Sequence, residues 1–108
     1  MIEKNMLINL LSSICSKANI EDQSAECTVL SCVVNNDIFL IAFASWQDKP
    51  YAKVVPLEAL VGYSKTCVNV FYSPWGLYVF SEDLKNLIEK IKNKIRKLKN
   101  LNLSFDLS

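Results

Sequence analysis

The sequence has 108 residues with 51% hydrophobic side chains and a formal net charge of +1, which fits one folded domain with a sizeable core and excludes a disordered chain. Its longest unbroken apolar run covers residues 38–44, far short of the roughly 20 residues of a membrane-spanning helix. Because it contains no histidine and only two glycines, the chain lacks the commonest general base and any glycine-rich phosphate loop.

The N-terminal segment over residues 2–18 predicts a helix, because its apolar side chains recur at intervals of three and four residues. The polar stretch over residues 20–25 is expected to end it. Glu3 beside Lys4, and Asn9 within the apolar stretch, do not fit the basic-then-apolar order of a secretion signal. We therefore interpret this segment as the first helix of an intracellular, cytoplasmic protein rather than a secreted one.

Residues 25–34 and 37–46 predict two strands, rich in valine, isoleucine and phenylalanine, joined at Asn35 and Asn36. Asparagine tolerates the left-handed conformation that a two-residue hairpin turn requires. Both faces of this hairpin are apolar, so we expect the sheet to be covered on both sides. Because only two long helices are predicted to cover it, the remaining hydrophobic surface predicts a homodimer.

The middle of the chain predicts short elements separated by turn residues. They are a turn over 47–50, a short strand over 51–55, a helical turn over 56–61, a strand over 66–72, a turn over 73–76 and a strand over 77–80. The last two strands would form a second hairpin. We expect the aromatic residues gathered there to fill the core, with only Trp75 exposed to stack on single-stranded bases.

A long C-terminal helix is expected from Ser81, whose hydroxyl can cap it, to about Asn100. Its apolar stripe from Leu84 to Leu98 is spaced 4, 3, 4 and 3 residues apart. This spacing suits either packing against the sheet or a seam between two helices. The candidate self-association residues, in this helix and the tail after it, are Ile88, Ile91, Ile95, Leu98, Leu103 and Phe105.

Positive charge is concentrated in the same helix. Residues 84–100 hold seven basic side chains and one acidic one, a net charge of +6, whereas the rest of the chain has five basic and ten acidic ones. Such a cluster is either a solvated face or a surface for nucleic-acid phosphates. With a single arginine, such binding would not distinguish base sequence. The candidate nucleic-acid contacts are Lys90, Lys92, Lys94, Arg96, Lys97, Lys99 and Trp75.

The C-terminal residues 101–108 alternate strictly between apolar and polar side chains, which is the period of a strand. A strand at this place can join its own sheet, join the sheet of a neighbour, or dock on another protein by strand addition. We predict that this tail is an ordered strand.

The four cysteines are Cys15, Cys27, Cys32 and Cys67. They include no C-x-x-C pair, and without histidine a zinc site would need all four thiolates. Cys27 and Cys32 are five residues apart, so on a strand they face opposite sides, which disfavours zinc. We expect mainly reduced, buried core residues without metal, and disulfides are the alternative.

These patterns predict an α+β fold with an antiparallel sheet of four to five strands in two hairpins, and amphipathic helices at the N- and C-termini. The chain is expected to form one domain over residues 1–108. Residues 1–100 would form its helix–hairpin–strand–hairpin–helix body, and residues 101–108 the strand-like tail.

The lack of catalytic, metal-binding and cofactor-binding motifs favours a non-enzymatic, homo-oligomeric protein-interaction or assembly module. A sequence-nonspecific nucleic-acid-binding accessory protein is the alternative, and a thiol enzyme using Cys67 or Cys15 is the catalytic alternative. Besides a homodimer, the expected partner is another protein at the hydrophobic sheet face or the tail, and no membrane. Eleven lysines against one arginine are typical of an AT-rich genome, such as that of a phage or virus.

Overall fold

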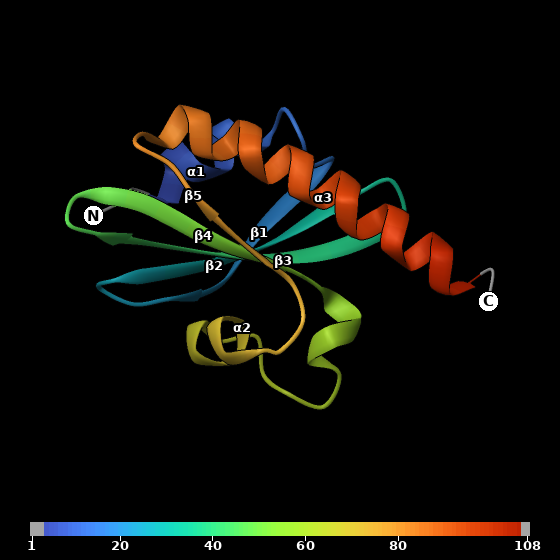
Figure 1. The fold of residues 1–108 in the computed structure, drawn as a ribbon. Coiled ribbons are helices and arrows are strands. Elements are labelled where there is room, and N and C mark those ends of the chain that lie inside the picture. The colour runs from blue at the N-terminus through green and yellow to red at the C-terminus, as the bar shows by residue number, and fades with distance from the viewer. Residues whose placement is uncertain (1–3, 107–108) are drawn as a thin grey trace.

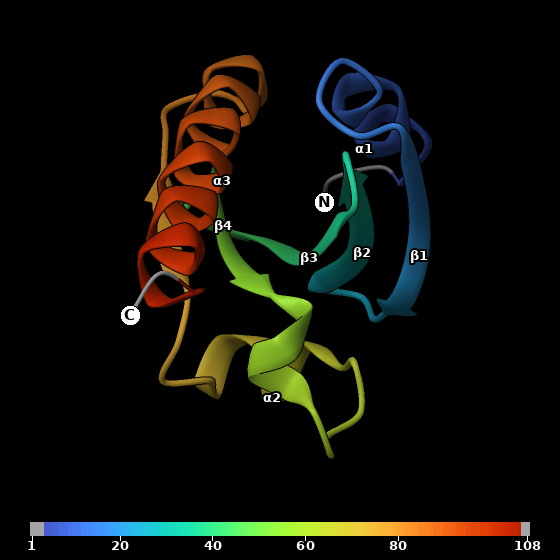
Figure 2. The same cartoon turned by 90° about the vertical axis from the view of Figure 1, so that its right-hand side faces the viewer.

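The computed structural model describes residues 4–106. In chain order the elements are α1 (Lys4–Leu11), β1 (Lys17–Gln23), β2 (Cys27–Val34), β3 (Asp37–Trp46), β4 (Lys49–Pro56), η1 (Leu57–Leu60), α2 (Cys67–Tyr72), β5 (Leu77–Phe80) and α3 (Leu84–Asp106). The strands form a five-stranded antiparallel sheet in the order β1-β2-β3-β4-β5. Helices α1 and α3 lie on one face of this sheet, and η1 and α2 lie on the other (Figure 1, Figure 2). The predicted α+β class with an antiparallel sheet is confirmed.

The hairpin predicted at Asn35 and Asn36 is confirmed, because β2 and β3 pair on either side of these residues. Asn35 has a φ of 57°, the left-handed conformation that a tight turn between strands needs. A second tight turn lies at Gln47 and Asp48, both with positive φ. Since this turn needs only two residues, β4 begins at Lys49, earlier than predicted.

The segment after α1 differs from the prediction. The helix ends at Leu11, and residues 17–23, which were assigned to the end of the helix and a polar linker, form the edge strand β1. Ala18 and Ile20 in this strand pack against the core beneath α1 and α3. Pairing with β2 satisfies the backbone along a whole strand, and this tertiary gain outweighs a helical spacing of side chains.

The strand predicted before the 73–76 turn is wrong, because Cys67–Tyr72 forms helix α2. Thr66 caps this helix, and its Oγ1 accepts a hydrogen bond from Asn69 N at 3.3 Å. Valine and aromatic residues favour strands in general. Here, however, the residues of α2 that pack toward the sheet are three and four positions apart, which only a helix can bring to one side. The second predicted hairpin is therefore replaced by pairing of β5 with β4.

Helix α3 begins later and ends later than predicted. Asp83 rather than Ser81 caps it, with Oδ1 accepting from Asn86 N at 2.8 Å. The helix continues to Asp106, so the predicted C-terminal strand is wrong as far as that residue, and residues 107–108 lie outside the described part of the chain. A helix satisfies its hydrogen bonds locally, whereas a strand needs a free sheet edge beside it. Figure 1 shows the last turns of α3 extending past the sheet.

Each face of the sheet has its own hydrophobic core, so the expectation that both faces are covered is met within one chain. Neighbouring residues of β3 alternate between the cores, with Leu40 on one side and Ile41 on the other. Among the side chains that the structure describes, sixteen are buried in the first core, beneath α1 and α3: Leu7, Leu11, Cys15, Leu30, Cys32, Phe39, Ile41, Phe43, Ala52, Val54, Val79, Leu87, Ile88, Ile91, Ile95 and Leu98. The second core, beneath η1 and α2, buries six: Val29, Leu40, Ala42, Val55, Leu60 and Val70.

The cysteines form two disulfides, which corrects the expectation that they are mainly reduced. Cys15 bonds to Cys32 in the first core, with 5.3 Å between their Cα atoms. Cys27 bonds to Cys67 and ties β2 to α2 beside the second core, with 6.4 Å between the Cα atoms. The predicted placement of Cys27 and Cys32 on opposite faces is confirmed. The pairing needs tertiary contact between residues 17 and 40 positions apart, so spacing in the sequence could not reveal it.

Candidate functional site

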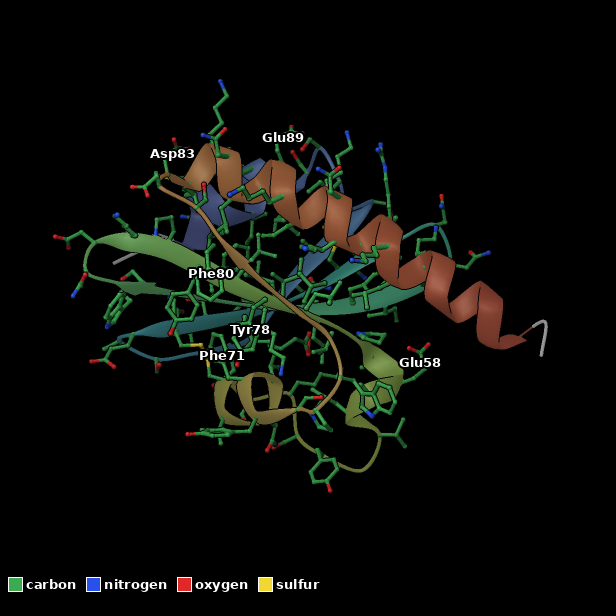
Figure 3. The ribbon with its side chains drawn as sticks, viewed as in Figure 1. Glu58, Phe71, Tyr78, Phe80, Asp83 and Glu89 are labelled. Carbon is green, nitrogen blue, oxygen red and sulfur yellow. A yellow bond between two sulfur atoms is a disulfide. The ribbon has the colours of Figure 1, made fainter. Side chains whose placement is uncertain are left out.

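Aromatic side chains gather where β4 and β5 extend beyond the cover provided by α2. The register of these strands places Tyr51 opposite Phe80 and Lys53 opposite Tyr78. Because alternate strand residues share a face, all four side chains point to the α2 side of the sheet. Figure 3 shows Phe80, Tyr78 and Phe71 of α2 in a line that runs from the start of α3 down to α2.

The rings in this line are held close to parallel. The ring centroids of Tyr78 and Phe80 are 6.1 Å apart with 13° between their planes, and those of Phe71 and Tyr78 are 6.2 Å apart with 20°. Tyr51 lies 5.9 Å from Phe80 and 5.7 Å from Phe71. These separations lie in the range where aromatic pairs attract one another. The line is therefore a preorganised row of rings rather than a set of independent side chains.

Further apolar side chains extend this row in both directions. A groove of about 450 Å³ lies between Trp46, Tyr51 and Phe80, and one of about 440 Å³ lies along Tyr51 and α2 as far as Tyr72. A third groove of about 410 Å³ continues from Tyr72 to Trp75. Shared residues join the three grooves into one region, which we call the aromatic surface: Trp46, Tyr51, Tyr63, Val68, Phe71, Tyr72, Trp75, Tyr78 and Phe80.

Most of the aromatic surface is open to solvent. Tyr72 is 84% exposed, Trp46 69% and Phe80 64%. The expectation that these aromatic residues fill the core, with only Trp75 exposed, is therefore wrong. It failed because it assigned residues 66–72 to a strand that pairs with residues 77–80, whereas the chain forms a short helix there and leaves β5 at the edge of the sheet.

Lys53 supports the aromatic surface from below and is only 3% exposed. Its Nζ donates a hydrogen bond to Phe71 O at 3.0 Å and another to Ser73 O, and it lies 5.1 Å from the ring centroid of Tyr78. The hydroxyl of Tyr78 also donates to Phe71 O at 2.8 Å. Burial lowers the pKa of Lys53 below its ordinary value of 10.5. Its contacts make Lys53 a positioning residue that fixes the end of α2 on β4.

The turn before β5 is also tight against β4. Gly76 has a φ of 100°, a conformation that favours glycine. A Cβ atom on Gly76 would overlap Val55 Cγ1 and Val54 O. This close approach holds the backbone of the turn directly against β4.

The β5 edge of the sheet is protected against a further strand. Ser81 N donates to Pro50 O at 3.4 Å, and antiparallel alternation from that pair turns the backbone groups of Tyr78 and Phe80 away from β4. One of these outward groups, Phe80 O, accepts a hydrogen bond from Lys90 Nζ at 2.8 Å. A lysine at an edge is a common means of preventing strand addition.

The β1 edge carries similar protection. Its register shifts between Ile20 and Asp22, as in a β-bulge, and Glu21 at the shift pairs with Lys65 at 3.4 Å. Bulges and charged side chains both discourage edge-to-edge pairing. Both outer strands of the sheet are therefore protected against the addition of a further strand.

The predicted nucleic-acid residues do not form one site. The basic side chains lie on α3, on one side of the sheet, whereas Trp75 lines a groove with residues of η1 and α2 on the other side. Two of these basic side chains have partners within the chain. Lys90 Nζ donates a hydrogen bond to Phe80 O, and Lys99 Nζ lies 3.7 Å from Asp37 Oδ2. Arg96 and Lys97 are exposed, and Lys92 and Lys94 are half-buried.

The predicted self-association residues of α3 are used inside the chain. Ile88, Ile91, Ile95 and Leu98 are buried in the first core, so a seam through them would require this core to open. Leu103 and Phe105 belong to the α3 backbone, and their side chains lie outside the described part of the chain.

Two further properties bear on function. In the part of the chain from residue 4 to residue 106, no cluster of three His, Cys, Asp or Glu residues could hold a metal ion. Over the same residues, each helix is too short or too polar to cross a lipid bilayer.

Sequence reasoning identified part of the aromatic surface and missed the rest. Trp46 and Tyr51 were assigned to separate strands, and Lys53 was not singled out. The alternation of Tyr78 and Phe80 with Leu77 and Val79 indicates a strand with one aromatic face. It does not indicate whether that face is covered.

Comparison with protein-family models, with curated proteins and with solved structures found no match.

Proposed function

We propose that this protein is a non-enzymatic assembly module that forms a homodimer by burying its aromatic surface against that of a second copy. The single observation that carries this proposal is the contiguous, preorganised and exposed row of rings across β4, β5 and α2. Aromatic residues are the commonest anchors of protein interfaces, because each offers a large contact area with little conformational freedom to lose.

The area of the aromatic surface suits a stable interface. A buried aromatic side chain contributes about 150–250 Å², so the six aromatic residues that are at least 45% exposed present on the order of 800 Å². A standard interface buries about 800 Å² on each partner. A monomer that left so large an apolar area in water would be unusual.

The charge of the aromatic surface favours a second copy as the partner. The charged residues at its margin, Lys49 and Glu82, pair with each other at 3.1 Å, and Lys53 is buried beneath it. A symmetric dimer brings identical patches together, so an unpaired charge on the patch would meet its own image. An uncharged aromatic surface avoids this repulsion.

The surface proposed for the homodimer differs from the one that the sequence predicted. The sequence predicted a dimer because both faces of the β2–β3 hairpin are apolar, but α1, α3, η1 and α2 cover those faces within the chain. The support now comes from β4 and β5, where the α2 side of the sheet is left open.

Size-exclusion chromatography coupled to light scattering tests the proposal. The oxidised protein should elute at micromolar concentration with twice the 12.3 kDa mass of one chain. Replacing Phe80→Asp should raise the dissociation constant about a hundredfold or more, because the symmetric interface would then bury two carboxylates side by side.

Met6→Asp is the matched control. Met6 is also an exposed apolar residue, at 47%, but it lies on α1, on the opposite side of the sheet. This variant should dimerise like the wild type. A wild-type protein that stays at the mass of one chain, or a Phe80→Asp variant that dimerises unchanged, would overturn the proposal.

A second candidate function is sequence-nonspecific binding of nucleic acid along α3. Its support is the net charge of +6 over residues 84–100 and the exposure of Arg96 and Lys97. Replacing Lys92, Lys94, Arg96 and Lys97 by glutamine should flatten the slope of log affinity against log salt by roughly 3–4 on duplex DNA. Failure of the wild type to bind duplex or single strands at about 50 mM salt would remove this candidate.

The two disulfides support a setting in which thiols are oxidised. Such settings are the extracytoplasmic spaces of most organisms and the cell interior of hyperthermophiles. The sequence alone favoured a cytoplasmic protein, and of these settings only the hyperthermophile interior agrees with that expectation. Intact-mass measurement of the protein isolated under non-reducing conditions tests this: two disulfides lower the mass by about 4 Da relative to four thiols, one hydrogen per bonded sulfur.

A further inference from the structure

The two disulfides differ in how accessible they are. In the first core, Cys32 is fully buried and Cys15 is 6% exposed. Cys27 and Cys67 are both partly exposed, and they line two different grooves. Cys27 lines a groove between the β1–β2 turn and the end of β3, and Cys67 lines the groove of the aromatic surface. A soluble thiol can therefore reach the second disulfide far more readily than the first.

The accessible disulfide also holds the segment that completes the aromatic surface. Val68, Phe71 and Tyr72 all lie on α2, and Cys67 is the first residue of this helix. Apart from the disulfide, the polar contacts that the structure describes between the α2 region and the sheet lie at the two ends of the helix. At its start Cys67 N donates to Asp22 Oδ2 at 3.0 Å and Lys65 pairs with Glu21. At its end Lys53 donates to Phe71 O and Ser73 O, and the hydroxyl of Tyr78 donates to Phe71 O.

The apolar packing beneath α2 is also limited. Over residues 5–99, whose burial is described, the second core buries six residues and the first core sixteen. Of these six, Leu60 and Val70 come from the η1–α2 segment, and the others belong to the sheet. Regions with few buried apolar contacts open first. The covalent bond from Cys67 to β2 is thus a main restraint on this layer.

We propose that the Cys27–Cys67 disulfide is a reversible modification site at which a low-molecular-weight thiol controls whether the aromatic surface is assembled. This inference rests on the proposed function, because the controlled surface is the proposed dimer interface. In the oxidised protein α2 is tied to β2 and the row of rings is complete. In the reduced protein α2 separates from the sheet more often, and Phe71 and Tyr72 leave the row.

The chemistry is thiol–disulfide exchange with a monothiol of the glutathione class. A thiolate of the reagent attacks the sulfur of Cys27 or Cys67, forming a mixed disulfide and releasing the other cysteine as a thiolate, which takes up a proton. A second reagent thiolate then attacks the reagent sulfur of the mixed disulfide and releases the second cysteine. Two molecules of reagent thiol are oxidised to one reagent disulfide, and one protein disulfide is reduced to two thiols.

Control of association by a disulfide has a reciprocal consequence. If the oxidised form dimerises more tightly than the reduced form, dimerisation must stabilise the disulfide to the same extent. The disulfide should therefore become harder to reduce as the protein concentration rises. A disulfide with no influence on association would show no such dependence.

The experiment combines graded reduction with measurement of mass. The full chain is equilibrated with increasing ratios of reduced to oxidised glutathione, and free thiols are alkylated and mapped by peptide mass spectrometry. We expect Cys27 and Cys67 to be alkylated at ratios about tenfold or more below those that reduce Cys15 and Cys32, because α2 can separate after reduction and the first core keeps its two thiols together. Over that interval light scattering should report conversion of dimer to monomer, while far-UV circular dichroism retains most of its amplitude.

Variants separate the modification site from the proposed function. The double variant Cys27→Ser with Cys67→Ser should fold and dimerise about tenfold or more weakly than the oxidised wild type. The matched control, Cys15→Ala with Cys32→Ala, removes the disulfide of the first core and should keep wild-type dimerisation. Should this control fail to fold, the graded reduction of the wild type still provides the comparison.

Different results would overturn the proposed disulfide control and the proposed homodimer. Wild-type dimerisation of the Cys27→Ser, Cys67→Ser variant would overturn the modification site and leave the proposed function standing. Reduction of both disulfides at the same glutathione ratio, or a ratio independent of protein concentration, would also overturn it. An oxidised wild type that is monomeric at every concentration would overturn the proposed function, and with it the control of association.

Discussion

The face of the sheet beneath α1 and α3 buries sixteen apolar residues and encloses its disulfide, whereas the face beneath η1 and α2 buries six and leaves its disulfide at the surface. Both faces begin from the same strands, so the alternation of side chains alone does not separate them. The difference comes from their covers. Helix α3 spans 23 residues and α2 spans 6, so the shorter helix leaves the end of β4 and β5 open.

This contrast suggests a division of tasks between the two faces. A large, enclosed core supplies most of the free energy of unfolding, because buried apolar area is the dominant stabilising term. A small core with an open margin can present aromatic residues to a partner and can rearrange without unfolding the rest of the chain. The following predictions test this division, from the largest expected effect to the smallest.

The neighbours Ile41 and Leu40 provide a matched comparison of the two cores. Both are fully buried on β3, but Ile41 belongs to the first core and Leu40 to the second. Replacing Ile41→Ala should lower the free energy of unfolding by about 4 kcal/mol, and Leu40→Ala by about 2–3 kcal/mol, because a thin layer can collapse into the space left behind. Urea unfolding measures both. Equal losses would contradict the division of tasks.

Removing each disulfide should destabilise the chain through the unfolded state. The loop closed by Cys27 and Cys67 spans 40 residues and that closed by Cys15 and Cys32 spans 17. Loop entropy then predicts that the free energy of unfolding falls by about 4 kcal/mol in the Cys27→Ser, Cys67→Ser variant. It should fall by about 3 kcal/mol in the Cys15→Ala, Cys32→Ala variant. Limited proteolysis adds a local measurement. Only the variant that lacks the Cys27–Cys67 disulfide should be cleaved faster within residues 61–76. Equal cleavage of both variants would speak against a loosely held α2 layer.

Lys53→Met should lower the free energy of unfolding by about 1–3 kcal/mol, because it leaves Ser73 O without its donor and removes one of the two donors to Phe71 O, which keeps the hydroxyl of Tyr78. The apolar stem of methionine retains most of the packing of the lysine. The decrease in the free energy of unfolding therefore measures the contribution of the ammonium group. Loss of near-ultraviolet circular dichroism from the aromatic row should accompany it. An unchanged stability would mean that water replaces the lysine at these carbonyls.

The lowered pKa of Lys53 also predicts a dependence on pH. Between that lowered pKa and 10.5, the unfolded chain binds more protons at this residue than the folded chain, so the contribution of Lys53 to stability rises with pH. It is highest above 10.5 and is lost as the pH falls through the folded pKa. The difference in free energy of unfolding between wild type and Lys53→Met, measured by urea from neutral to alkaline pH, should therefore grow with pH. A constant difference would contradict the buried site.

Phe80→Asp should lower the free energy of unfolding of the monomer by only about 1 kcal/mol, because this residue is largely exposed and loses only its ring contacts with Tyr51 and Tyr78. The same substitution is expected to weaken the dimer strongly. Thermal melting at a concentration where the wild type is monomeric separates the two effects. A large loss of monomer stability would assign Phe80 to the core rather than to an interface.

The predictable parts of the fold depend on local signals. The turn at Asn35 needs a left-handed conformation that asparagine tolerates, and the strands beside it are rich in β-branched residues. The helical spacing from Leu84 to Leu98 correctly indicated a helix, and the residues on that stripe lie in the first core or pack against it. Each of these elements depends on residues that are close together in the chain, so its secondary structure can be predicted from the sequence.

The errors arose where a distant segment decided the outcome. Residues 17–23 became a strand because β2 offered an edge, and Cys67–Tyr72 became a helix because only that form turns Val70 to the second core. The tail up to Asp106 stayed helical because it extends past the sheet and had no edge to join. In each case the local preference was weak, and a tertiary contact outweighed it.

The sequence by itself therefore determined the α+β class, the central hairpin, the final helix and the concentration of positive charge on it, since these depend on period, turn chemistry and composition. Only the tertiary structure decided which cysteines pair, which aromatic residues remain exposed and where Lys53 sits. These features depend on contacts between residues far apart in the chain, and their energies exist only after the sheet and its two covers have come together.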